Sequence, residues 1–124
     1  ASNPRRYASK ETSVNLATSG STTVNYTGYI PALPVFTIVC PSGTTGVKIE
    51  NAATGDYVLV SGTLTGTLTI DNNKKFVALG NEKRMDLLDI NSDWITLLLG
   101  SQKINVTVTG KAVTSITMKY TVTK

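Results

Sequence analysis

The sequence predicts an all-β domain, an antiparallel β-sandwich of roughly ten short strands. Threonine, valine and isoleucine together supply 40 of the 124 residues. Their β-branched side chains suit the pleated backbone of a strand. Short apolar segments alternate with turn residues about every eight to twelve positions, a spacing typical of sandwiches. Hydrophobic residues make up 40% of the chain and charged residues 16%, which is a globular balance.

The chain length of 124 residues fits one domain. We expect residues 1–12, which are polar, to form an N-terminal arm or a first edge strand. Residues 13–124 are then a single β-sandwich domain. Because the sequence starts at Ala1 rather than at Met, we expect an excised or processed part of a longer protein.

The first half of the chain contains five expected strand segments. Val14 and Leu16 alternate with polar neighbours, and further strands follow at 22–27, 35–39, 47–50 and 57–60. Residues 35–39 are apolar at nearly every position, so we expect this strand to be buried on both faces. The turn at 51–56 places Gly55 where a positive φ is needed.

The second half continues the pattern with one interruption. Residues 63–70 alternate threonine with Leu64, Leu68 and Ile70, and a hairpin turn at 71–73 leads into 75–79, because Asn tolerates the left-handed conformation. Residues 80–90 are expected to be mostly loop, with Met85, Leu87 and Leu88 facing inward from a helical turn capped by Asn81. An apolar segment at 94–99, a turn at 100–102 and strands at 103–109 and 116–123 follow. The expected core contains Val35, Ile38, Val47, Ile49, Val58, Val60, Leu68, Ile70, Ile104, Val106, Ile116, Met118 and Tyr120.

Several kinds of chemistry are excluded by composition. The chain has no histidine and one cysteine, Cys40, so it has no Ser-His-Asp triad, Cys-His dyad, His-ligated zinc or internal disulfide. Cys40 ends an apolar run and is expected to be a buried hydrophobe. Asp86, Asp89 and Asp93 are close in sequence, but loop carboxylates are usually solvated. We therefore expect no enzyme and no cofactor.

One short motif suggests a cation site. Asp89, Asn91 and Asp93 match the first, third and fifth positions of an EF-hand loop. Trp94 stands where that loop needs glycine, and Gly100 stands where it needs a bidentate glutamate. We therefore predict no metal site.

The net charge of +4 and the pI near 9.3 come from dispersed positive residues, clustered only at Arg5, Arg6 and Lys10. Nucleic-acid binders usually gather such charge on one face, so we expect no nucleic-acid partner. The longest apolar run, 97–99, is far shorter than the roughly 20 residues that cross a bilayer, and we expect no membrane association.

Four aromatic residues are candidates for a binding surface. Sugar-binding modules stack saccharides on aromatic rings, and Trp94, Tyr57, Tyr26 and Tyr29 are the candidates for saccharide or partner contact. The competing interpretation places Trp94 in the core, with residues 95–99 continuing a buried strand. We favour the core for Trp94.

One ordered set of short segments runs along almost the whole chain. The segments are Asn3-Pro4-Arg5-Arg6-Tyr7, Asn25 to Gly28 with Pro31-Ala32-Leu33-Pro34, Ile49-Glu50-Asn51 with Thr54-Gly55, Leu68-Thr69-Ile70-Asp71, Leu88-Asp89, Ser92-Asp93 and the strand from Gly100 to Gly110. In this order they resemble the C-terminal domain of the distal tail protein of siphophages and related prophages. Leu99 and Lys103 depart from the family, which tends to have Pro and Asn there.

The resemblance implies a galectin-like, jelly-roll type sandwich and a structural role at the virion tail tip, in a protein made in the bacterial host cytoplasm. It implies docking to other phage tail, baseplate or receptor-binding proteins, a homo-hexameric full-length protein and a monomeric isolated domain. Two alternatives stay open. One is a carbohydrate-binding module for host cell-wall saccharides, and the other is a bacterial surface or pilus subunit.

Overall fold

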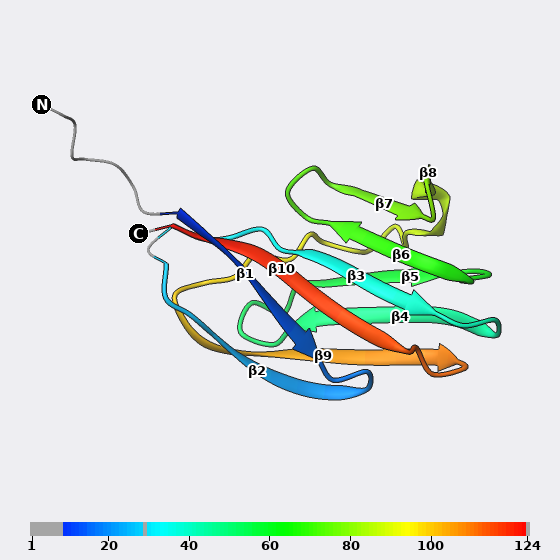
Figure 1. The fold of residues 1–124 in the computed structure, drawn as a ribbon, viewed down its shortest axis with the longest axis horizontal. Coiled ribbons are helices and arrows are strands. Elements are labelled where there is room, and N and C mark those ends of the chain that lie inside the picture. The colour runs from blue at the N-terminus through cyan, green and yellow to red at the C-terminus, as the bar shows by residue number, and fades with distance from the viewer. Residues whose placement is uncertain (1–8, 29, 124) are drawn as a thin grey trace, which may run out of the picture.

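The computed structural model describes residues 9–28 and 30–123 and confirms the all-β sandwich (Figure 1). These residues form ten strands and one short 3-10 helix. The elements are β1 (Ser9–Leu16), β2 (Gly20–Tyr26), β3 (Val35–Cys40), β4 (Thr44–Asn51), β5 (Tyr57–Ser61), β6 (Gly66–Asp71), β7 (Phe76–Leu79), β8 (Glu82–Lys83), η1 (Met85–Leu87), β9 (Gly100–Gly110) and β10 (Ser115–Thr123). Strand β1 crosses the boundary expected at residue 12, so residues 9–12 belong to a sheet. Residues 1–8, with the rest of the expected arm, lie outside the described part.

The strands form two antiparallel sheets. The six-stranded sheet has the order β1-β10-β3-β6-β7-β8, and the four-stranded sheet has the order β2-β9-β4-β5. Successive strands β1 and β2 therefore lie at the edges of different sheets. The one helix in the described residues has three residues, and none of the described helices could cross a membrane.

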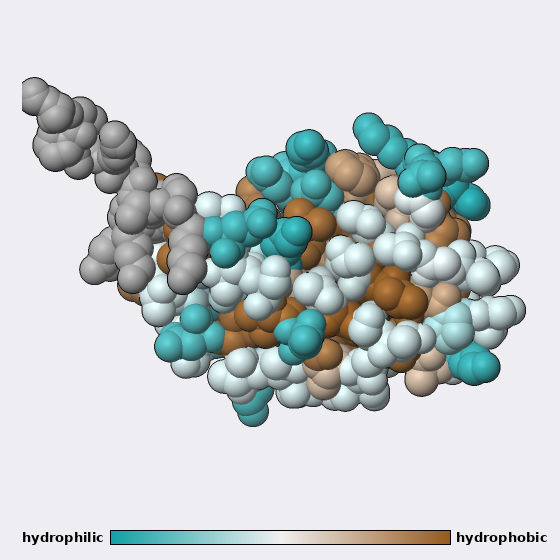
Figure 2. All heavy atoms as spheres, in the orientation of Figure 1, coloured by the Kyte–Doolittle hydropathy of each residue, from teal (hydrophilic) through white to brown (hydrophobic). Residues whose placement is uncertain are grey.

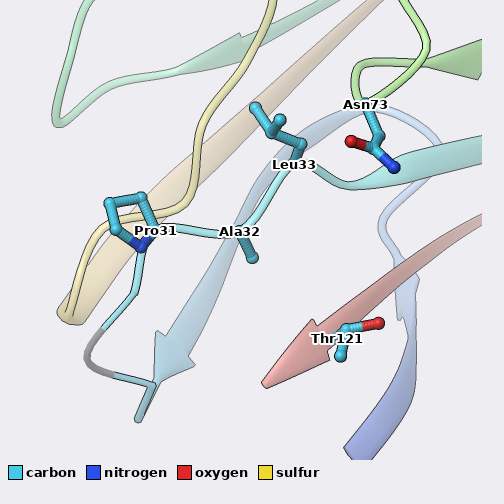
Figure 3. Close-up of a pocket in the computed structure, with 5 residues that line it drawn as sticks. All are labelled: Pro31, Ala32, Leu33, Asn73 and Thr121. Atoms are coloured by element: carbon cyan, nitrogen blue, oxygen red, sulfur yellow. The ribbon is translucent and has the colours of Figure 1, made fainter. Parts of the chain in front are cut away.

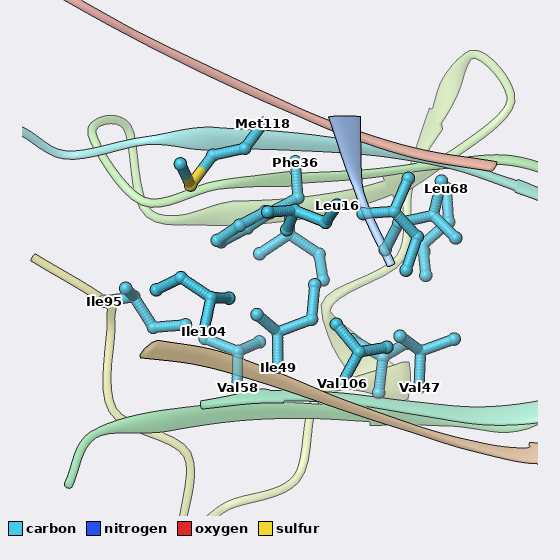
Figure 4. Close-up of a cluster of buried hydrophobic side chains, with 14 of the residues drawn as sticks. Leu16, Phe36, Val47, Ile49, Val58, Leu68, Ile95, Ile104, Val106 and Met118 are labelled. Carbon is cyan, nitrogen blue, oxygen red and sulfur yellow. The ribbon is translucent and has the colours of Figure 1, made fainter. Parts of the chain in front are cut away.

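Each sheet turns one apolar face toward the other. Leu16, Phe36, Leu68 and Met118 of the six-stranded sheet point toward residues such as Ile49 and Ile104 of the four-stranded sheet (Figure 4). All the core residues that the alternation predicts are buried except Val35. Each large apolar side chain contributes roughly 1.5–3 kcal/mol when buried. The fold is thus stabilised mainly by contact between the two sheets.

Strand β3 is buried on one face rather than on both. Phe36, Ile38 and Cys40 point into the core, whereas Val35 is half-buried and Val39 is 39% exposed. The prediction of burial on both faces was wrong. Strand β3 is central in its sheet, between β10 and β6, but among the described residues no second layer covers the outer face of that sheet. Neighbouring strands pair with the backbone of β3, but they do not bury the side chains on the outer face of the sheet.

The apolar segment 94–99 is a loop rather than the expected strand. It makes one isolated bridge, between Leu97 and Ala32. Ile95 and Leu97 are nevertheless fully buried, and Trp94 is half-buried and packs against the core. Its apolar composition thus reflects burial of a loop, which periodicity cannot distinguish from a buried strand.

Two local expectations also change. The helical turn forms at Met85–Leu87, but Arg84 precedes it without a side-chain cap, and Met85 is 44% exposed while Leu87 is buried. In the β6–β7 turn, the residue with positive φ is Lys75 at 59°. Asn72 is instead fully buried, and its side chain bonds the backbone of Pro34 and Ile95. Gly55 has the expected positive φ, 79°.

Candidate docking surface

One end of the sandwich exposes large apolar side chains. Ile30, Leu98 and Leu99 are 48%, 40% and 60% exposed, and Pro31 is exposed beside them. We call these four residues the apolar end. The segments that carry them lie side by side because Ala32 N–H donates to Leu97 O at 3.1 Å and Leu97 N–H donates to Ala32 O at 2.8 Å. This is the end at which β1 begins and β10 finishes (Figure 1).

The buried side chain of Asn72 joins these two segments. Its Oδ1 accepts the N–H of Ile95 at 2.8 Å, and its Nδ2 donates to Pro34 O at 2.7 Å. A buried amide with partners on both atoms restricts the backbone that it contacts, because losing either bond leaves a polar group unsatisfied.

Gln102 and Asn51 hold the rest of the loop. Gln102 Oε1 accepts the N–H of Leu98 at 2.9 Å, and its Nε2 donates to Leu98 O at 2.8 Å. Asn51 Nδ2 donates to Thr96 O at 2.9 Å. The backbone of loop 95–98 is thus hydrogen-bonded by the side chains of Asn51, Asn72 and Gln102 and by the backbone of Ala32. These bonds replace those that a strand would make to its neighbours in a sheet. Leu98 is therefore presented in a fixed position although its loop lies outside the sheets.

An open hollow of about 200 Å³ adjoins the apolar end. It is lined by Pro31, Ala32, Leu33, Asn73 and Thr121, which come from the 30–34 segment, the β6–β7 turn and the end of β10 (Figure 3). Lys74 and Lys75, next to Asn73 in that turn, are exposed, and hydrophilic residues gather over the turn (Figure 2). The hollow thus has apolar residues on one side and two positive charges in the adjoining turn.

A polar row crosses the outer face of the four-stranded sheet. Ser21, Asn105, Glu50 and Tyr57 lie in register on β2, β9, β4 and β5. Ser21 Oγ donates to Asn105 Oδ1 at 2.6 Å, and Asn105 Nδ2 donates to Glu50 Oε1 at 3.3 Å. Lys48 Nζ lies 4.6 Å from the centre of the Tyr57 ring, a cation–π distance. This row combines hydrogen-bonding groups with one half-exposed aromatic ring.

The four aromatic candidates do not form one platform. Tyr26 is 1% exposed, its hydroxyl donates to Ile30 O, and its ring meets Tyr120 edge-on at 5.8 Å. A buried ring cannot stack on a sugar, so the expectation of surface contact through Tyr26 is corrected. Tyr29 lies outside the described residues. Trp94 and Tyr57 are half-buried, and Asp93 next to Trp94 donates its N–H to Tyr57 O at 2.8 Å.

The acidic segment after η1 covers a sheet edge. Asp89 N–H donates to Leu59 O at 2.8 Å, and Ser92 Oγ accepts the N–H of Leu59 at 2.9 Å. Together with the bond from Asp93 to Tyr57, these contacts run along the outer edge of β5. No group of three His, Cys, Asp or Glu residues in the described chain could hold a metal ion. The backbone of the segment that carries the Asp-x-Asn-x-Asp motif thus pairs with the edge of β5.

The described titratable groups with shifted pKa do not assemble into a reaction centre. Burial raises the pKa of the Cys40 thiol, which makes a thiolate nucleophile less available. Burial, with a smaller effect of Tyr26, raises the pKa of Tyr120. Arg84 lowers the pKa of Asp86 through a side-chain hydrogen bond at the exposed turn before η1. These shifts follow from packing and one surface pair.

The fold is a two-sheet antiparallel β-sandwich that exposes an apolar end and a polar row. A family model described as the siphovirus-type tail component, C-terminal domain, matches residues 27–123. This chain belongs to that family and is a structural component of a phage tail. The resemblance found in the sequence is thereby confirmed, and the pilus alternative is set aside.

Among solved structures, the chain is similar to the SPP1 Dit protein, whose crystal structure is described as a paradigm of the hub adsorption apparatus in phages that infect Gram-positive bacteria. The TM-score is 0.78 and the sequence identity 20%, so this likeness shows the fold. The match covers 95% of this chain and 48% of SPP1 Dit, so the chain spans about half the length of that protein. No curated protein matches the sequence.

Proposed function

We propose that this chain is a non-enzymatic docking domain at the phage tail tip, which links the tail-tube hub to baseplate or receptor-binding proteins. Membership of the tail-component family supports this role, and the similar SPP1 Dit protein is described as a hub of the adsorption apparatus. The observation that carries the proposal is the apolar end, where a loop without a strand partner is held rigid and still exposes leucine.

The proposed occupant of the apolar end is a neighbouring tail or receptor-binding protein. Exposed leucine and isoleucine are stabilised when a partner covers them, and a preformed surface avoids the entropy cost of ordering a loop on binding. Lys74 and Lys75 favour a partner surface that is apolar at its centre and acidic at its rim.

The test compares two variants, in each of which exposed apolar residues are replaced by serine, in a binding assay with purified tail-tip components. The double change Leu98→Ser and Leu99→Ser should weaken binding at least about tenfold, because hot-spot residues at an interface each carry 1–2 kcal/mol or more. Ile90→Ser is the matched control, since Ile90 is 92% exposed in the segment along β5. Equal weakening by both variants, or no binding of the unaltered chain to any component, would contradict the proposal.

We further propose that the full-length protein is a homo-hexamer in the tail. The present chain spans about half of the similar SPP1 Dit protein. We assign the ring-forming contacts to the part of the full-length protein that this chain does not include. Native mass spectrometry of the full-length protein should give six copies; a stable monomer would contradict this part of the proposal.

The second candidate function is recognition of host cell-wall saccharides, and the polar row across the four-stranded sheet favours it. Asn105 and Glu50 can hydrogen-bond sugar hydroxyls beside the face of Tyr57, with Trp94 on the adjacent segment. A pull-down with purified cell walls tests this function. Binding that is lost in Tyr57→Ala would support the row, and no binding by the unaltered chain would eliminate it.

A further inference from the structure

Edge strands expose backbone hydrogen-bonding groups, and three of the four sheet edges in the described residues are shielded. Strand β8 has two residues, both charged. Strand β5 is covered by the segment from Leu88 to Asp93. Strand β1 carries the charged residue Glu11, which lies 4.0 Å from Lys119 of β10. Short length, charge and covering segments are the usual means by which proteins prevent edges from pairing.

Strand β2 has none of these features. It runs for seven residues, Gly20–Tyr26, without a charged residue or a proline. All seven residues pair with β9 in an unbroken register from Gly20–Val106 to Tyr26–Gly100. Among the described residues, no segment pairs with its other edge. The edge of β2 is therefore long, regular and uncharged, which are the properties that favour addition of another strand.

We propose that β2 pairs antiparallel with β2 of a second copy of this chain, about a two-fold axis at Thr23. Thr23 is the middle residue of the strand, so pairing about it uses every residue. Ser21 then lies opposite Asn25 of the other copy, and Thr22 lies opposite Val24. These positions are uncharged, so a second copy meets no like charge along the strand. The two four-stranded sheets become one continuous sheet.

Two-fold pairing also explains why such an edge need not cause aggregation. Each copy uses the same strand, so the contact closes on itself and leaves no β2 edge free. A contact confined to one strand pair buries little surface, and we expect the dimer only at high protein concentration. At low concentration the isolated chain remains the monomer expected from the sequence. The inference is independent of the proposed docking at the apolar end.

The test is sedimentation velocity from about 10 μM to 1 mM, where weak complexes dissociate. The unaltered chain should shift from monomer toward dimer. Thr23→Lys and Thr23→Asp should each remain monomeric, because two like charges would face each other at the axis. An equimolar mixture of the two variants should associate again, because opposite charges then meet.

The control is Thr107→Lys, an exposed threonine on the outer face of the interior strand β9, which should leave dimerisation unchanged. Circular dichroism checks that each variant is folded. A monomeric unaltered chain at every concentration, assemblies larger than a dimer, or unaltered association of Thr23→Lys would overturn the proposal. So would Thr23-dependent capture of another tail protein by a chain that remains monomeric, since the edge would then belong to that partner.

Discussion

The side-chain amide of Asn51 donates to Oε1 of Gln102 across 2.9 Å inside the sandwich. The two residues lie on adjacent strands, β4 and β9, and both are buried. Each also bonds the backbone of the loop that carries the apolar end, Asn51 at Thr96 and Gln102 at Leu98. The pair therefore connects the four-stranded sheet to the exposed leucines through hydrogen bonds that water cannot replace.

Replacing Asn51 should destabilise the fold and loosen this loop. Asn51→Ala leaves Thr96 O without its donor and removes a partner of Gln102, which should lower the free energy of unfolding by about 2–3 kcal/mol. Chemical denaturation measures this change. Asn91→Ala, at an exposed asparagine, should cost less than about 0.5 kcal/mol. An equal effect of the two substitutions would refute the role given to Asn51.

Neighbouring residues of β3 should respond very differently to truncation. Ile38 is fully buried and Val39 is 39% exposed. Ile38→Ala should therefore lower the free energy of unfolding by about 2–5 kcal/mol, the range for cavities in a core. Val39→Ala should cost less than about 1 kcal/mol. Comparable losses measured by denaturation would mean that both faces of β3 are buried.

Alkaline pH should destabilise the domain in part through Cys40. Burial raises the pKa of this thiol above its ordinary value of 9.0. Because the thiol binds its proton more tightly in the folded state than in the unfolded state, protonation stabilises the fold. This stabilisation is complete below the pKa that the thiol has in the unfolded chain, and it is lost as the pH rises through the pKa that the thiol has in the folded protein. Stability should therefore fall as the pH rises above about 9, and fall less in Cys40→Ala. Denaturant midpoints across this range provide the measurement.

Tyr120 should add to that alkaline loss, because burial raises its pKa as well. The variant Cys40→Ala should consequently retain part of the pH dependence. Identical pH profiles for Cys40→Ala and the unaltered chain would show that the thiol is not linked to folding.

The segment along β5 should matter for stability but not for calcium. Ser92→Ala removes the acceptor of the Leu59 N–H and should lower the free energy of unfolding by about 1 kcal/mol. Thermal unfolding with millimolar calcium or with EDTA should give one melting temperature, since no group of three acidic side chains in the described residues could hold an ion. A calcium-dependent rise in melting temperature would reverse this assignment.

Much of the sandwich could be predicted because local alternation reports which face a residue takes. Ile104 and Val106 on β9, and Ile116 and Met118 on β10, were assigned correctly to the core in this way. The apolar end could not be predicted from the same pattern. Asn51, Asn72 and Gln102 lie in segments that read as polar turns, and their partners are up to 51 residues away for Asn51 and 38 for Asn72. No sequence periodicity marks an asparagine that will be buried.

The sequence by itself determined the fold class, the inward face of most strands and the family, because these follow from residue type and short-range order. Only the tertiary structure decided that residues 94–99 form a loop and that Tyr26 is buried against Tyr120. It also decided that, within the described residues, the outer edge of β2 is unpaired while that of β5 is covered. These outcomes depend on which distant segments meet. Hydrogen bonds and packing between such segments are set by the closure of the two sheets, which no local window of sequence contains.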